Sequence, residues 1–145
     1  MLFFAIKILA MSKYIYELPF KVRDYECDIQ GIVNNSVYQN YLEHTRHEFI
    51  LTEGISFTDL HTQGIDTVVA RIQISYKTPL RSGDEFVSKL YLKKEGVKYV
   101  FYQDIFRLPD HVLCVRAVVE TVATVDGKLA ARCDVLDEVF GKYFD

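Results

Sequence analysis

The residues most suited to chemistry lie in a short acidic segment just before the longest helical pattern in the chain. Asp28 is followed three positions later by Gly31, and Asn34 and Asn35 stand where helical spacing begins. A helix start presents backbone N–H groups and a partial positive charge, so it can stabilise an oxygen that gains negative charge. A nearby carboxylate could attack a carbonyl carbon or activate water against it. The segment therefore predicts a site for acyl transfer, and Gly31 would let a ligand approach the backbone closely.

The remaining sequence predicts the elements that must position this segment. Strand patterns and turn residues alternate with two helical stretches before the C-terminus. The predicted elements are a strand over 14–22, a loop over 23–34, a helix from Asn35 to Gly54, a short helix from Ser56 to Gly64, strands over 66–76, 85–95, 98–108 and 112–125, and a short C-terminal helix. Pro19 predicts that the first strand lies at an edge of its sheet, since proline cannot donate to a strand ladder.

This order of elements predicts an α+β fold, with an antiparallel sheet covered on one face by the long helix. In the 66–76 strand, alternation predicts that Val68, Ala70, Ile72, Ile74 and Tyr76 share one side. The 112–125 strand is apolar on both sides over much of its length. A second subunit is a sensible cover for its other face, which is an argument for a dimer.

Composition narrows the function classes. The chain has 145 residues, a size that suits one domain, and its 17 basic and 20 acidic residues give a net charge of −3. This balance argues against a general nucleic-acid binder, which needs a concentrated basic surface. The three cysteines lack metal-ligand spacing and are odd in number, which predicts no metal, no disulfide framework and a reducing, cytoplasmic location. No cofactor is predicted.

The N-terminal run of ten residues, MLFFAIKILA, is apolar but too short to span a bilayer, and it lacks the cleavage site of a secretory signal. Met11 resembles a normal start. We therefore expect residues 1–13 to be an extension upstream of the natural start, residues 14–145 to form a single domain, and the chain to have no membrane role.

The segment from Val22 to Arg46 resembles the signature of the 4-hydroxybenzoyl-CoA thioesterase-like family of hotdog acyl-CoA thioesterases. The motif residues are Arg23, Glu26, Asp28, Gly31, Val33, Asn35, Tyr38, Glu43 and Arg46. A second family landmark is matched by Tyr76, Pro79, Arg81, Gly83 and Asp84. The resemblance covers roughly residues 14 to 132. One departure is Ile32, where many relatives carry histidine, and it leaves the details of the pocket open.

The resemblance implies a hotdog fold, in which an antiparallel sheet wraps around one long central helix, and hydrolysis of an acyl-CoA or acyl carrier protein thioester. By position, Asp28 matches the catalytic carboxylate and Asn35 the residue whose backbone amide faces the thioester oxygen. Gly31 matches the tight turn, and Val33 and Tyr38 lie on the substrate side. The coenzyme A phosphates would meet basic residues, for which the candidates are Lys93, Lys94, Lys98 and Arg81. Nucleophile and general base both remain open as the role of Asp28.

Plainer interpretations stand beside these. An aspartate before a helix is by default a cap or a solvated residue. Glu43 and Arg46 are three positions apart on the helix, which favours a structural ion pair, and Cys27 is more simply an inert thiol than a nucleophile. The lysines at 93, 94 and 98 could form a solvated hairpin.

Three other functions compete with thioester hydrolysis. A hotdog dehydratase would need a histidine at the site, and residues 23–43 contain none. A non-catalytic acyl-CoA or lipid-binding protein needs the same cleft without Asp28. An interaction module needs neither the cleft nor Asp28. The register of Asp28 with Gly31 and Asn35 disfavours both the binding protein and the interaction module.

Overall fold

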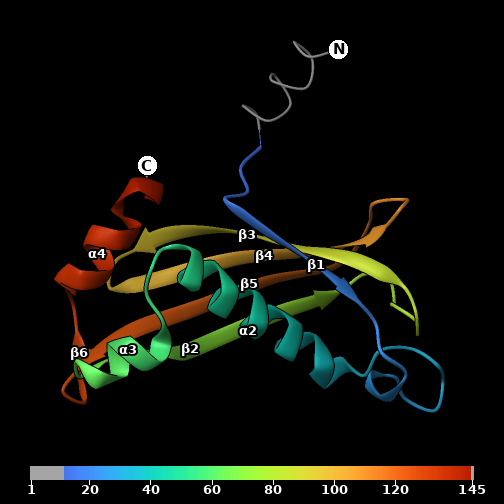
Figure 1. The fold of residues 1–145 in the computed structure, drawn as a ribbon, viewed down its shortest axis with the longest axis horizontal. Helices are drawn as coiled ribbons and strands as arrows, with labels where there is room; N and C mark the ends of the chain where they lie inside the picture. The colour runs from blue at the N-terminus through green and yellow to red at the C-terminus, as the bar shows by residue number, and fades with distance from the viewer. Residues whose placement is uncertain (1–11, 145) are drawn as a thin grey trace, which may run out of the picture.

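The computed structural model describes residues 12–144 and contains a curved antiparallel sheet with helices on one side (Figure 1). The sheet order is β1-β3-β4-β5-β2, with β6 paired to the end of β5. The elements are β1 (Tyr16–Lys21), the 3-10 turn η1 (Asp24–Glu26), α2 (Asn35–Thr52), α3 (Phe57–Thr62), β2 (Ile65–Tyr76), β3 (Glu85–Glu95), β4 (Lys98–Leu108), β5 (Val112–Val125), β6 (Lys128–Ala130), α4 (Asp134–Phe140) and the 3-10 turn η2 (Gly141–Tyr143).

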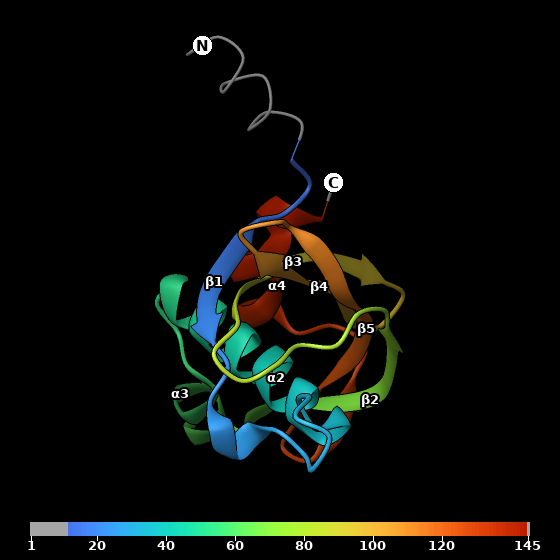
Figure 2. The same cartoon turned by 90° about the vertical axis from the view of Figure 1, so that its right-hand side faces the viewer.

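The sheet wraps around α2, as the end-on view in Figure 2 shows. One face of α2 carries Tyr38, Tyr41, Leu42, Phe49 and Ile50, all of which are buried. Their spacing of three and four residues forms one apolar stripe, and burying that stripe against the sheet stabilises the helix. The predicted α+β hotdog architecture is confirmed.

The strand pairings follow the predicted pattern. β3 and β4 pair from Glu85↔Leu108 to Glu95↔Lys98, which confirms the hairpin around Gly96. β1 lies at one edge of the sheet, as Pro19 predicts, and the 12-residue strand β2 lies at the other. The elements that flank the acidic segment, β1 and α2, therefore have positions fixed by the sheet.

The predicted alternation of β2 is wrong in its first half. Val69 lies opposite Thr121 and Arg71 lies opposite Glu120, so Ala70 is one extra residue in the strand. Such a β-bulge reverses the alternation of side chains across it. Val68 consequently does not share a face with Ile72 and Ile74, and Val68 and the extra residue Ala70 are both exposed.

The helix ends match the sequence signals, with one exception. Gly54 and Gly64 follow the caps of α2 and α3 with φ of +82° and +79°, and the Ser56 side chain accepts a hydrogen bond from the Asp59 amide at 3.0 Å. Asn34 is the N-cap residue of α2, but its side chain makes no capping hydrogen bond. The start of the longest helix is therefore left without a side-chain cap.

Two predictions concern the chain's relation to membranes and its N-terminus. Between residues 12 and 144, no helix has the length and apolar character needed to cross a bilayer. Residues 1–11 of the predicted extension lie outside the described residues.

Candidate active site

The loop that carries Asp28 is held as a small ladder against the start of α2. Cys27 pairs with Val33, and the Asp28 amide donates to the Ile32 carbonyl at 2.8 Å. The Gly31 amide closes the turn on the Asp28 carbonyl at 2.9 Å. Because Val33 directly precedes the N-cap of α2, the ladder brings Asp28 and the helix start to the same end of the molecule (Figure 1).

The Asp28 side chain is exposed, and one of its oxygens accepts a hydrogen bond from the Gln30 amide at 2.8 Å. Within residues 12–144 no lysine, arginine or histidine lies within ion-pair distance of this carboxylate. The second oxygen is therefore available to a ligand. The hydrogen bond from the Gln30 amide limits the orientations of the Asp28 side chain but brings no positive charge to it.

The start of α2 is suited to an anionic oxygen. Its first turn contains no acidic residue, and Asn34 supplies no side-chain acceptor. The first N–H groups of a helix have no acceptor within it, so the amides at Asn35 and Ser36 point out of the helix end. The Asn35 carbonyl is fixed from the other side by the Tyr76 hydroxyl, which donates to it at 3.2 Å.

A cavity of about 200 Å³ adjoins this helix start. It is bounded by the end of β2, the segment that follows β2 and the first turn of α2. Its lining residues are Ile32, Val33, Asn35, Tyr38, Tyr76, Lys77, Thr78 and Pro79. The structure thus brings three of the predicted residues, Val33, Asn35 and Tyr38, to one cavity beside the Asp28 loop.

Tyr38 has a structural task in this cavity. Its hydroxyl accepts a hydrogen bond from the Leu80 amide at 3.1 Å, and its ring lies edge-on to Tyr76 at 5.5 Å. Burial raises the pKa of Tyr38, so the phenol stays neutral.

Tyr76, Lys77 and Thr78 are not among the predicted site residues. The Tyr76 and Pro79 landmark is the sequence signal that points to this segment.

The loop requires a glycine at position 31 because of its backbone conformation, and not because a side chain there would clash. Its φ is +79°, and a Cβ built there would meet no atom within 4 Å. We expect Gly31→Ala to lower the free energy of unfolding by about 1–2 kcal/mol, the cost of left-handed backbone for an ordinary residue. Gly141→Ala is the matched control, because Gly141 has a φ of −54° and equal space. Urea denaturation measures both, and equal losses in the two variants would contradict this account.

The other acidic groups of the segment are engaged. The Asp24 carboxylate accepts from the Ser82 hydroxyl, and Glu26 accepts from the Tyr41 hydroxyl at 2.9 Å and from the Arg23 amide at 2.8 Å. Burial raises the pKa of Tyr41, and the hydrogen bond to the Glu26 carboxylate and the charge of that carboxylate raise it further. These bonds fasten η1 to α2 and to the Ser82 turn, so Asp24 and Glu26 position the loop.

Cys27 is unsuited to nucleophilic attack. Burial raises the pKa of its thiol, and the carboxylates of Asp24, Glu26 and Asp28 add to that shift. A thiol with a raised pKa stays protonated near neutral pH and is a weak nucleophile. This supports the interpretation of Cys27 as an inert thiol.

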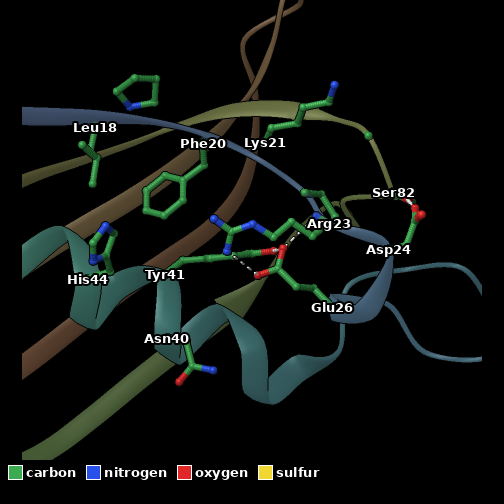
Figure 3. A pocket seen from close by; sticks show the side chains of 13 residues that line it. Leu18, Phe20, Lys21, Arg23, Asp24, Glu26, Asn40, Tyr41, His44 and Ser82 are labelled. Carbon is green, nitrogen blue, oxygen red and sulfur yellow. Dashed lines mark hydrogen bonds and ion pairs between the residues drawn. The ribbon is translucent and has the colours of Figure 1, made fainter.

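A larger cavity, of about 860 Å³, lies between β1 and α2 and is also lined by Asp24 and Glu26 of η1. Figure 3 shows the Arg23 side chain reaching into it toward Glu26, with Phe20 and Tyr41 on either side. Neither Asp28 nor Asn35 lines this cavity. Size alone therefore does not identify the candidate site; the smaller cavity is the one that Asn35 lines, and Asp28 lines neither.

The predicted basic residues separate into two groups. Arg81 forms a bridge with Ile32 and is exposed beside the Asp28 loop. Lys93, Lys94 and Lys98 lie at the far end of the β3–β4 hairpin, about 25–35 Å along the strand from Glu85. Lys98 pairs with Glu120 at 2.7 Å and Lys94 with Asp137 at 3.5 Å. Within one chain, therefore, Arg81 alone of the four lies beside the site.

The predicted ion pair between Glu43 and Arg46 is wrong. Arg46 turns inward and donates to the Gln103 side chain at 2.9 Å, while Glu43 pairs with His47 at 3.7 Å. Burial lowers the pKa of Arg46 to about 10, so the guanidinium remains charged at neutral pH. Helical spacing alone could not show that the residue lies over the sheet rather than on the surface.

Among residues 12–144, no cluster of three histidine, cysteine or acidic side chains is arranged to hold a metal ion.

Comparison with known proteins identifies the family. Residues 22–140 match the model of the thioesterase-like superfamily. The chain belongs to this superfamily. The match spans η1, the Asp28 loop, α2 and all of the sheet except β1, so it contains the whole candidate site.

Comparisons with individual proteins are consistent with this assignment. The chain is 39% identical over 101 residues to the chloroplastic acyl-acyl carrier protein thioesterase ATL3 of Arabidopsis thaliana, a match that covers 69% of the chain and 53% of the plant protein. The chain thus spans about half of that relative's length. A hypothetical protein of Aquifex aeolicus superimposes with a TM-score of 0.80 at 26% identity, over 86% of the chain and 98% of its own.

A third comparison bears on the fold alone. The 1,4-dihydroxy-2-naphthoyl-CoA thioesterase Slr0204 from Synechocystis superimposes with a TM-score of 0.80 at 15% identity. The alignment covers 87% of the chain and 95% of that protein.

Proposed function

We propose that this chain hydrolyses an acyl thioester, with Asp28 as the catalytic carboxylate and the Asn35 backbone amide as the oxyanion donor. The observation that carries the proposal is the ladder of residues 27–33, which ties the Asp28 loop to the uncapped start of α2. Within residues 12–144 the Asp28 carboxylate has no ion-pair partner, and the smaller cavity adjoins Asn35. Membership of the thioesterase-like superfamily supports the same reaction.

In this mechanism the thioester carbonyl lies at the start of α2 and its oxygen accepts a hydrogen bond from the Asn35 amide. Attack at the carbonyl carbon moves charge onto that oxygen, where the amide and the helix dipole stabilise it. When the tetrahedral intermediate collapses, the C–S bond breaks and the thiolate leaves. Asp28 either takes a proton from the attacking water or attacks the carbon itself, forming an anhydride that water then opens.

The acyl group would occupy the cavity lined by Val33, Tyr38 and Tyr76, where apolar and aromatic side chains predominate. The carrier of the thioester is coenzyme A or acyl carrier protein. The plant relative, whose printed name specifies acyl carrier protein, supports the second carrier. Arg81 and Lys77, exposed beside this cavity, are available to the phosphate of either carrier.

We also propose that the chain forms a homodimer or homotetramer in a reducing, cytoplasmic setting. β2 is a long edge strand with three exposed apolar side chains, Val68, Val69 and Tyr76, and such an edge is a template for pairing with another chain. Cys27, Cys114 and Cys133 are free thiols, which fits a reducing compartment. Sedimentation of the full chain measures its assembly state.

The test of the function is thiol release from a panel of acyl-CoA and acyl carrier protein thioesters of varied chain length, followed with a thiol reagent. We expect turnover that depends on enzyme concentration for at least one acyl chain. Release from none of them, with tight binding of one, would instead favour the non-catalytic binding protein.

A further inference from the structure

Tyr76 makes a hydrogen bond that the start of α2 does not need in order to satisfy its backbone. Its hydroxyl donates to the Asn35 carbonyl at 3.2 Å, across 41 positions of sequence. Asn35 is the first residue of α2, and the carbonyl of a first helical residue already accepts from the amide four positions later. Tyr76 is 47% exposed, so burial does not force this contact either, because water could bond the hydroxyl equally well.

The Tyr76 ring is held in the position from which this bond forms. Tyr76 is the last residue of β2, and its ring packs edge-on against the buried ring of Tyr38 at 5.5 Å. The Tyr38 hydroxyl accepts from the Leu80 amide at 3.1 Å, which anchors Tyr38 to the segment after β2. Both rings line the cavity beside Asn35. The hydroxyl therefore reaches α2 from a wall of the candidate site.

The Asn35 carbonyl belongs to the same peptide group as the Ser36 amide. Because a peptide group is planar and conjugated, a donor on its oxygen fixes the plane and makes its N–H a stronger donor. Of the first three amides of α2, that of Val37 donates to the Asn34 carbonyl at 2.9 Å, and those of Asn35 and Ser36 have no acceptor within residues 12–144. Tyr76 thus acts on an N–H group that is free to bind an oxygen of the substrate.

We propose that Tyr76 is a positioning residue for thioester hydrolysis and acts through the Ser36 amide, which joins the Asn35 amide in binding the thioester oxygen. The inference rests on the proposed function and adds to it a second donor and the side chain that tunes this donor. Attack moves negative charge onto the oxygen, so a polarised amide gains more in the transition state than in the ground state. Loss of the Tyr76 hydroxyl should therefore lower kcat and kcat/KM equally.

The first test is Tyr76→Phe, which removes the hydroxyl and keeps the ring as a wall of the cavity. Loss of a whole oxyanion donor costs about 10²–10³ in kcat, and a neighbouring bond strengthens a hydrogen bond by roughly 10–30%. We therefore expect kcat to fall about two- to eightfold with KM unchanged. Tyr102→Phe is the matched control and should change neither, because it removes a hydroxyl that donates to Glu95 at 2.9 Å and Tyr102 lines neither cavity.

The second test varies the strength of the donor, to which a merely structural role would not respond. A ring-fluorinated tyrosine at position 76 donates more strongly, so kcat should exceed that of wild type at a pH where the phenol is protonated. The Ser36 amide proton gives a readout without turnover in protein labelled with isotopic serine, and Ser36→Ala assigns its resonance. This resonance should move upfield in Tyr76→Phe and downfield with the fluorinated residue.

Several results would overturn the role of Tyr76. These are an undiminished kcat in Tyr76→Phe, a loss that appears in KM, an equal loss in Tyr102→Phe, a kcat that does not rise with donor strength, or a Ser36 resonance that does not move. Wild-type turnover together with any of these results refutes this inference and leaves the proposed function standing. Wild type that hydrolyses no thioester refutes the proposed function, and the role of Tyr76 falls with it.

Discussion

Asp28→Asn should lower kcat for thioester hydrolysis by roughly 10²–10⁴ while the fold and substrate binding survive. The amide keeps the shape of the carboxylate and can still accept from the Gln30 amide, so the turn that holds the loop is preserved. What disappears is the negative charge, and with it the ability to take a proton from water or to attack the carbonyl carbon. Steady-state thiol release gives kcat, and circular dichroism checks the fold.

The matched control is Asp24→Asn, the same change four residues earlier in the same segment. Asp24 already accepts a hydrogen bond from Ser82, so we expect its loss to alter positioning and to reduce kcat by less than about tenfold. The two variants separate loss of charge at the reacting atoms from loss of local order. Undiminished turnover in Asp28→Asn, or an equal loss in both variants, would remove Asp28 from its proposed role.

Local signals in the sequence predict most of the fold. The turn at Gly96 and the glycines at positions 54 and 64 mark ends that depend on backbone conformation within a few residues, and all three are as predicted. The long helix is equally local in origin, because its stripe of apolar residues repeats every three to four positions. Element order then limits the topology to a sheet with one helical cover.

The details that the sequence does not predict depend on contacts across the fold. The extra residue Ala70 follows from how β2 pairs with β5, and no local residue marks it. Arg46 turns toward Gln103, which is 57 positions away, so spacing on the helix predicts the wrong partner. The separation of Lys93, Lys94 and Lys98 from the Asp28 loop likewise becomes visible only when the full length of β3 is placed.

The candidate site likewise has one part that the sequence predicts and one part that it does not. The motif residues Asp28, Gly31 and Asn35 are close in sequence, and helical spacing predicts the helix start, but the residues before it are predicted only as a loop and not as the ladder that they form. The far wall of the cavity comes from Tyr76 and Lys77, because the end of β2 meets the start of α2, where the Tyr76 hydroxyl donates to the Asn35 carbonyl. Sequence spacing contains no measure of that approach. The family landmark around Tyr76 and Pro79 indicates the segment without assigning it a role.

Phe86→Ala should lower the free energy of unfolding by about 3–5 kcal/mol, the usual cost of emptying a buried phenylalanine site. Phe86 is fully buried, its ring stacks on Phe20 at 4.9 Å, and it lies 4.8 Å from the Tyr41 ring. The sheet and α2 both have fixed backbones at this point, so the cavity can collapse only in part. Urea denaturation at one protein concentration, followed by circular dichroism, measures the loss.

The substitution should also reach the site, because Phe86 supports Tyr41 and Tyr41 holds Glu26 in η1. We therefore expect Phe86→Ala to lower kcat several-fold at temperatures where the variant is still folded. Phe106→Ala, which removes a half-buried ring from the same sheet, is the control and should cost less stability and leave kcat nearly unchanged. A loss of less than about 1.5 kcal/mol in Phe86→Ala, the scale of shape changes that a core tolerates, would mean that η1 and the Asp28 loop are held by their hydrogen bonds alone rather than by the core beneath them.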